Sequence, residues 1–118
     1  MVKATFVQGS KLPIQGFILS GHAGYAPHGE DIVCAGISGL SLGIANGLAE
    51  FLASRVNVQQ GANGWLAVRV VEQACSDEDL CRAETLLRTL RLGLEQIAQR
   101  YPGSLDIIES EVFPDDSL

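Results

Sequence analysis

Clusters of basic residues are what this sequence most clearly lacks. Its eight Lys and Arg residues are scattered over 118 positions, and 14 acidic residues give a net charge of −6. A surface that binds nucleic acid needs clustered cations to neutralise the phosphates. We therefore expect no direct nucleic-acid partner, whereas a basic peptide or protein would be electrostatically compatible with the chain.

The start of the chain also lacks the apolar run of a secretory signal. "MVKATFVQGSKL" is polar and interrupted, so we expect no signal peptide. The three cysteines form no C-x-x-C pair and match no zinc-ligand spacing. Reduced thiols in a cytoplasmic protein are the simplest interpretation of this cysteine pattern.

Charge is absent from residues 32–49, a run that is almost long enough to span a bilayer. Its glycines, serines and asparagine make it much less apolar than the lack of charge suggests. Asp31 and Glu50 flank it, and no basic residue follows before Arg55 to anchor a membrane topology. We predict a buried helix of a soluble domain here, and expect no membrane partner.

Two kinds of apolar spacing predict the fold. Short apolar runs bounded by turn residues indicate strands, and intervals of three and four indicate helices. Their order, ββαββαβ, predicts an α+β fold in which a largely antiparallel sheet is covered by two helices. We expect one domain over residues 1–113 and an acidic tail over 114–118. The expected strands are 4–8, 14–20, 56–60, 65–71 and 105–112; the expected helices are 32–54 and the segment between Ser76 and Pro102.

Local signals support these elements. Asp31 is expected to cap the first helix, and Ser76 the second, with Asp79 completing a capping-box-like pair. Asn63-Gly64 supplies the positive φ angles that a tight hairpin turn needs. The expected core stripes are Ile37, Leu40, Ile44, Leu48 and Phe51 on the first helix, and Leu80, Leu87, Leu90, Leu94, Ile97 and Tyr101 on the second.

Gly39, Gly43 and Gly47 recur every four residues beside the first stripe. Each costs a helix about 1 kcal/mol relative to alanine. Close approach of another backbone would offset this cost, and that backbone could belong to the sheet or to a second copy of the helix.

Cys34 and His22 are the candidate catalytic pair. With Asp31 as N-cap, Cys34 lies in the first helical turn, where free N–H groups and the helix dipole favour a thiolate. His22 follows the second expected strand, and the intervening loop is short enough to bring it close to the helix start. A Cys–His pair of this kind performs covalent catalysis. The first-turn amides, including the N–H of Cys34, are candidate oxyanion donors.

The loop between the two residues, "AGYAPHGE", carries Gly24 and Gly29 near its ends. Such a segment can open and close over a site as a lid, and Tyr25 could supply a contact surface for substrate.

Less specific interpretations stay open at this point. Cys34 is also explained as a core residue, and His22 and the loop glycines as turn residues. A zinc site is a more specific alternative. Suitable zinc ligands are offered by His22, His28, Asp31 and Cys34. Their spacing, however, matches no standard zinc pattern.

The stretch "GHAGYAPHGEDIVCAGIS" resembles the signature of the ribosomal-processing cysteine proteases (the Prp family). In that family a Gly-His-Ala motif precedes Gly-x-Asp-Ile-Val-Cys-Ala at this separation. The resemblance implies a cytoplasmic bacterial endopeptidase that removes the N-terminal extension of a large-subunit ribosomal protein. It implies Cys34 as nucleophile and His22 as general base. It further implies that Gly21 turns the chain at His22, and that Asp31 and Ser38 support the site.

The same resemblance implies a homodimer, a loop over the site from Ala23 to Glu30, and recognition of paired aromatic residues just before the cut. It implies no cofactor and no metal. Gly36 replaces the alanine or other small residue usual in the motif, which removes no functional group, and His28 is not part of the pattern. The substrate-contacting residues are then Ala23, Gly24, Tyr25, Gly29 and Glu30. A non-catalytic ribosome-associated binding module of the same fold is the alternative function.

Overall fold

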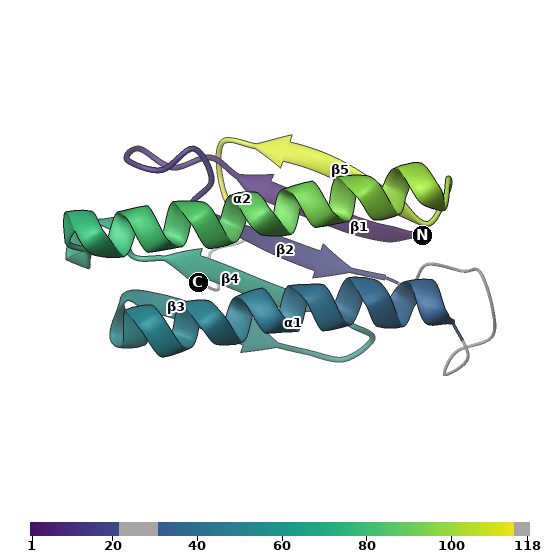
Figure 1. Cartoon of the computed structure of the whole chain (residues 1–118), viewed down its shortest axis with the longest axis horizontal. Coiled ribbons are helices and arrows are strands. Elements are labelled where there is room, and N and C mark those ends of the chain that lie inside the picture. The colour runs from purple at the N-terminus through teal and green to yellow at the C-terminus, as the bar shows by residue number, and fades with distance from the viewer. Residues whose placement is uncertain (22–30, 115–118) are drawn as a thin grey trace.

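The computed structural model describes residues 1–21 and 31–114 of the chain. Within these residues two long helices lie side by side on one face of a five-stranded sheet (Figure 1). The strands are β1 (Val2–Val7), β2 (Gly16–Ser20), β3 (Val56–Gln60), β4 (Leu66–Val70) and β5 (Leu105–Ser110); the helices are α1 (Ile32–Leu52) and α2 (Asp77–Arg100), with short 3₁₀ turns at Ala53–Arg55 and Glu72–Ala74.

The strand order in the sheet is β3-β4-β2-β1-β5. All neighbours are antiparallel except β1 and β5, which are parallel. The predicted α+β fold, with its ββαββαβ order and its largely antiparallel sheet, is confirmed. β1 begins at Val2 rather than at the predicted residue 4, because Val2 pairs with Leu105 at the start of the parallel ladder.

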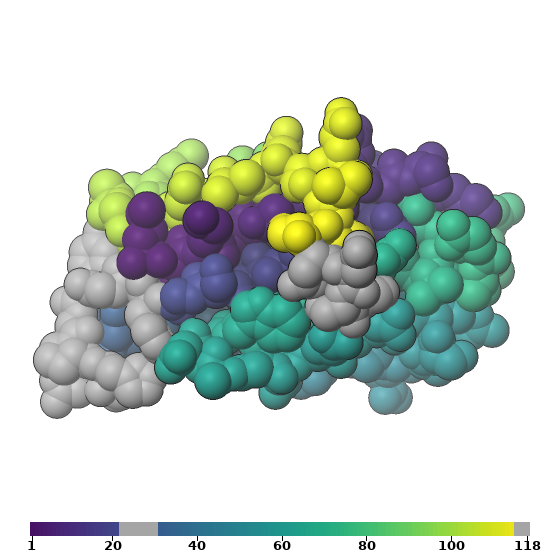
Figure 2. All heavy atoms as spheres, turned by 180° about the vertical axis from the view of Figure 1, so that it is seen from behind, coloured from purple at the N-terminus to yellow at the C-terminus, as the bar shows by residue number. Residues whose placement is uncertain are grey.

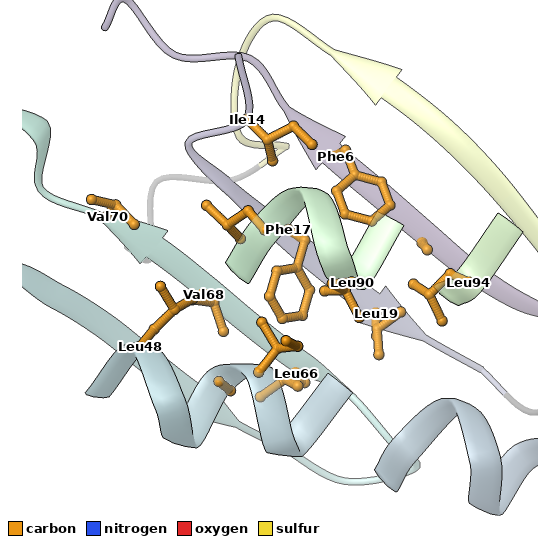
Figure 3. Close-up of a cluster of buried hydrophobic side chains, with 14 of the residues drawn as sticks. Phe6, Ile14, Phe17, Leu19, Leu48, Leu66, Val68, Val70, Leu90 and Leu94 are labelled. Carbon is orange, nitrogen blue, oxygen red and sulfur yellow. The ribbon is translucent and has the colours of Figure 1, made fainter. Parts of the chain in front are cut away.

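The core lies between the sheet and the two helices (Figure 3). Phe6 and Phe17 lie at its centre with their ring centroids 6.3 Å apart. Burying large apolar side chains of this kind contributes about 1.5–3 kcal/mol each. Around the two rings are Leu19, Leu66, Val68 and Val70 from the sheet, Leu48 from α1, and Leu90 and Leu94 from α2.

The buried face of α1 is rotated slightly from the predicted one. Ile37, Ile44 and Leu48 are buried as expected, but Phe51 is 53% exposed. The face that meets the core runs through residues 37, 41, 44, 48 and 52, so Ser41 and Leu52 occupy positions that the apolar pattern assigned to Leu40 and Phe51. A serine in a core stripe gives no apolar signal in the sequence, which explains the error.

The opposite face of α1 is exposed, so the prediction of a buried helix holds for one face only. The segment from Ile32 to Arg55 is long and apolar enough to cross a membrane by length and composition, and about a third of its most apolar stretch is buried. In the described residues, α1 packs most extensively against α2.

Of the two alternatives for the α1 glycines, close packing against the sheet is not what the described residues show. A Cβ placed on Gly39 or Gly43 would have no heavy atom within 4 Å in the described residues, and one on Gly47 would make ordinary contact with Leu86. The close approach between helices occurs elsewhere: a Cβ on Gly93 of α2 would lie 2.5 Å from a methyl group of Leu40. The glycine that permits tight helix packing therefore belongs to α2.

The second helix and the hairpin follow the sequence closely. Ser76 caps α2, and Ser76 and Asp79 make both hydrogen bonds of a capping box. Asn63 and Gly64 have φ angles of 59° and 76° in the turn between β3 and β4. Both features rest on short-range rules of backbone geometry, which is why the sequence predicted them correctly.

A buried carboxylate joins the β1–β2 loop to the segment before α2. Glu72 is 2% exposed and accepts hydrogen bonds from the backbone N–H groups of Ser10, Lys11 and Leu12 at 3.1, 2.9 and 2.7 Å. Burial raises its pKa, but these N–H donors prevail and hold it below the ordinary value of 4.5. Glu72 therefore fixes the loop as an ionised group.

The sheet face away from the helices carries the end of the described chain (Figure 2). The guanidinium of Arg69 lies over the ring of Phe113, 5.0 Å from its centroid. A Cβ on Gly16 would clash with the carbonyl oxygen of Val68 and would come 2.8 Å from the same ring, so glycine at the start of β2 leaves room for both. The predicted tail begins at Pro114 on this face, and residues 115–118 lie outside the described residues.

Candidate active site

Cys34 is the third residue of α1 and lies in its first turn. Its side chain is half-buried and packs against the core. Figure 1 shows this end of α1 beside the end of β2, so the strand that leads to His22 and the helix that carries Cys34 meet at one edge of the molecule.

Asp31 holds the first turn of the helix. Its Oδ1 accepts hydrogen bonds from the backbone N–H groups of Val33 and Cys34, each at 3.0 Å, and its carbonyl accepts the N–H of Ala35 at 3.0 Å. The predicted N-cap is confirmed. The suggestion that the N–H of Cys34 could stabilise an oxyanion is not supported, because this donor already binds the Asp31 carboxylate.

Gly21 fixes the point at which the chain leaves β2. Its φ of +89° lies in the region that favours glycine. A Cβ at this position would lie 2.7 Å from the carbonyl oxygen of Met1, and the Gly21 carbonyl oxygen lies 3.3 Å from where a Cβ on Gly64 would be. The end of β2 at Gly21 is thus enclosed by the N-terminus and by the β3–β4 turn.

Several predicted site residues lie outside the described part of the chain. The pairing of Cys34 with His22 and the zinc alternative through His28 both depend on them, so both stay predictions. Within residues 1–21 and 31–114 no group of three or more His, Cys, Asp or Glu side chains is arranged to hold a metal ion. The undescribed site residues are His22, Ala23, Gly24, Tyr25, His28, Gly29 and Glu30.

Ser38 lies one helical turn after Cys34 and lines a pocket of about 120 Å³ between α1 and the hairpin turn. Trp65 and Ser41 line the same pocket. Reasoning from the sequence missed both of them. Trp65 could have been found from its place directly after the Asn63-Gly64 turn, and Ser41 from its spacing of seven residues from Cys34.

The other two cysteines lie away from this edge. Cys75 donates a hydrogen bond from its Sγ to the carbonyl of Val71 at 3.4 Å, and burial raises its pKa. Cys81 is exposed on α2. None of the three cysteines forms a disulfide within the described residues, and Cys34 alone among them lies in the first turn of α1.

A half-buried thiol in the first turn of a helix, beside the strand end that leads to a histidine, is the arrangement expected of a cysteine protease built on an α+β fold. Comparison with known proteins gives the family. The chain belongs to the cysteine protease Prp family, whose model matches residues 1–106. The resemblance found in the sequence is confirmed.

Two relatives carry the same family name. The ribosomal processing cysteine protease Prp of Bacillus subtilis (strain 168) is 26% identical over 107 residues, covering 91% of this chain and 96% of that protein. The Prp of Staphylococcus aureus (strain Mu50 / ATCC 700699) is 32% identical over 85 residues, covering 71% of this chain and 76% of that protein. The chain thus spans most of the length of both relatives.

Solved structures match the fold. A crystal structure of the S. aureus processing protease Prp with a covalently linked product peptide has a TM-score of 0.79 and 23% identity, covering 93% of this chain and all of that chain. A crystal structure of a Streptococcus mutans protein has a TM-score of 0.69 and 28% identity, covering 93% and 96% of the two chains.

Proposed function

We propose that this cysteine protease is an endopeptidase that removes the N-terminal extension of a large-subunit ribosomal protein in the bacterial cytoplasm, with Cys34 as nucleophile and His22 as general base. The observation that carries the proposal is the position of Cys34 in the first turn of α1, inside a chain of the Prp family. The relatives' names, which specify ribosomal processing, support the substrate class.

The proposed reaction has two steps. The Cys34 thiolate attacks the scissile carbonyl carbon, the C–N bond breaks, and the His22 imidazolium gives its proton to the leaving amine. A water molecule then attacks the thioester while His22 takes its proton, which releases the extension with a new carboxyl group and restores the thiolate–imidazolium pair. Both steps use groups of the chain and water, so the proposal needs no metal or cofactor.

The electrostatic balance of the chain agrees with this substrate. Ribosomal proteins bind RNA and need clustered cations to do so, whereas this chain has a net charge of −6. Opposite net charges favour encounter between enzyme and substrate.

The direct test of this proposal uses a peptide that spans the extension and the first residues of the mature ribosomal protein. We expect cleavage by the wild-type chain under reducing conditions, measured by mass spectrometry, and none by Cys34→Ala or His22→Ala. Cys81→Ala is the matched control, because Cys81 is an exposed thiol on α2. Binding of the peptide by wild type without any cleavage would instead favour the ribosome-associated binding module.

We further propose that the chain acts as a homodimer and that the exposed face of α1 is the contact. In the described residues this face carries Gly36, Gly39 and Gly43 with nothing within 4 Å of their built Cβ positions. Ile32 is 77% exposed and Phe51 53% exposed at the two ends of the same helix. Exposed apolar residues beside a helix face that carries three glycines fit the close approach of a second copy.

A further inference from the structure

The outer face of the sheet, on the side away from both helices, carries an apolar row at its middle (Figure 1). An antiparallel sheet with one face toward water normally presents polar side chains on that face. Here the strand register sets three apolar residues and one threonine side by side. They are Ala67 on β4, Ile18 on β2, Thr5 on β1 and Ile108 on β5. A row of this composition favours a cover over the face.

A groove of about 460 Å³ follows this face along the strands. The apolar row forms its middle. Lys3, Ser20 and Trp65 line the end toward Gly21, and Phe113 and Pro114 line it where the described chain ends. The groove therefore begins at the C-terminal segment and runs toward the catalytic edge of the molecule.

The C-terminal segment enters the groove from a fixed position. The hydroxyl of Ser110 accepts the backbone N–H of Val112 at 3.2 Å, which holds the turn after β5. Phe113 then lies under the guanidinium of Arg69, 5.0 Å from ring centroid to the guanidinium carbon, and Gly16 leaves room for the ring. The family model ends at residue 106, so this segment lies beyond the family match.

Residues 115–118 are long enough to follow the groove. Four extended residues span about 13 Å. Along β2, the groove runs from Gly16, beside the Phe113 ring, to Ser20, which lines its other end. These positions are four residues apart, and four strand residues also span about 13 Å.

The charges of the groove complement the sequence Asp115-Asp116-Ser117-Leu118. Arg69 lies at the start of the groove and Lys3 at its other end. Lys3 has no ion pair among the residues that the structure describes. The one acidic residue among the described lining, Glu109, is paired with Arg91 at 2.6 Å. An acidic segment therefore fits the groove better than a basic one.

We propose that residues 111–118 form a C-terminal strap, in which Phe113 is the anchor and residues 115–118 dock along the groove. Asp115 lies near Arg69, Asp116 pairs with Lys3, and Leu118 packs toward Trp65. The strap covers the apolar row and keeps the outer face of the sheet from other partners. This inference goes beyond the proposed function and does not depend on which peptide the protein cleaves.

Fluorescence of Trp65 tests the strap, because Trp65 is the one tryptophan of the chain and lines the groove. The full chain is compared with a variant that ends at Pro114. We expect the shortened variant to show red-shifted emission and stronger quenching by acrylamide, because Trp65 gains contact with water. Its melting temperature should fall by about 2–8 °C.

A charge swap tests the same contact in a chain of full length. Lys3→Glu should raise the quenching of Trp65 toward that of the shortened variant at low salt, where charge pairs are least screened. Adding Asp116→Lys should restore the wild-type value. Asp106→Lys is the matched control, because Asp106 is the neighbour of Lys3 on β5, and it should not restore quenching. Melting temperatures show that each variant is folded.

Three results would overturn the strap. The first is unchanged Trp65 quenching in both the shortened chain and Lys3→Glu. The second is a rescue of Lys3→Glu by Asp106→Lys as complete as that by Asp116→Lys. The third is quenching in the full chain that rises on dilution, which would assign the groove to a second copy. If the shortened chain fails to fold, the charge swap decides alone, and none of these measurements depends on cleavage.

Discussion

The backbone N–H of Cys34 donates a hydrogen bond to the Asp31 carboxylate at 3.0 Å. The same oxygen accepts the N–H of Val33 at the same distance. This geometry makes Asp31 the residue that fixes the first turn of α1, and with it the backbone that carries the candidate nucleophile. We interpret Asp31 as a positioning residue that acts through the helix start.

The variants Asp31→Asn and Asp31→Ala distinguish the helix-capping role of Asp31 from a role of its negative charge. Asparagine caps helices about as well as aspartate, whereas alanine loses about 1 kcal/mol of stability. We expect Asn to keep kcat within about 3-fold of wild type and Ala to lower it by about 10-fold, with thermal unfolding measured on both. A folded Asn variant as inactive as Ala would show that the negative charge itself is required, and the pH profile of kcat/KM would then differ between wild type and Asn.

Gly21→Ala tests whether the strand end before His22 must keep its place. The substitution forces a Cβ onto a residue with φ +89° and into 2.7 Å of the Met1 carbonyl oxygen. We expect activity to fall by about 100-fold or more, since a misplacement of about 1 Å near the chemistry has that effect. Gly103→Ala is the control, because Gly103 has φ +84° but open space around it. Equal activity losses in the two variants would refute the idea that activity depends on the position of the strand end at Gly21.

Glu72→Gln tests the buried carboxylate between the β1–β2 loop and α2. Replacing it weakens the acceptor for three backbone N–H groups, and hydrogen bonds to charged groups contribute about 1.5–3 kcal/mol. We expect the free energy of unfolding at pH 7 to fall by about 2–3 kcal/mol in urea denaturation. Glu50→Gln, an exposed position on α1, should change it by less than about 0.5 kcal/mol.

The carboxylate of Glu72 also predicts how the free energy of unfolding falls at acid pH. Its pKa is lower in the folded than in the unfolded state, so the unfolded chain binds the proton more readily. The stabilisation that Glu72 provides is therefore fully present above about pH 5, and it is lost as pH falls through the pKa of Glu72 in the folded state. Glu72→Gln should show a shallower loss of stability below about pH 4 than wild type; parallel curves for the two proteins would argue against the assignment.

Gly43→Ala and Gly43→Lys test the α1 face as a dimer contact. In a single chain, Gly43→Ala should stabilise α1 by up to about 1 kcal/mol, because nothing in the described residues crowds the position. Across a close contact between two copies, alanine should weaken the dimer and lysine should abolish it, as measured by sedimentation velocity. Leu92→Lys, which changes an exposed apolar residue of α2, should leave the dimer unchanged.

The sequence predicted most reliably what depends on short-range geometry. The caps at Asp31 and Ser76 and the Asn63-Gly64 turn follow from local hydrogen bonding and φ preferences, and all three are confirmed. It predicted less well what depends on tertiary packing. The apolar spacing assigns Phe51 to the core, because it does not show that Ser41 and Leu52 occupy the core-facing positions instead.

The same contrast between short-range geometry and tertiary packing applies to the residues of the candidate site. Cys34 could be picked out because the rule for a helix start and the motif coincide at one residue. Trp65 and Ser41 each have a weak local signal, but no local signal shows that the fold brings the hairpin turn and the helix together around one pocket. One suggested oxyanion donor, the N–H of Cys34, instead binds the carboxylate of Asp31, which the spacing alone does not show.

Covalent labelling of the thiols tests the central claim most directly. A substrate-derived peptide ending in a chloromethyl ketone at the cleaved position alkylates a cysteine protease at its nucleophile, and the labelled residue is identified by peptide mapping. We expect stoichiometric labelling of Cys34, protection by excess substrate peptide, and a rate lowered by about 100-fold or more in His22→Gln. Labelling of Cys75 or Cys81 in preference to Cys34, or an unchanged rate in His22→Gln, would contradict the assignment of Cys34 and His22 as the catalytic pair.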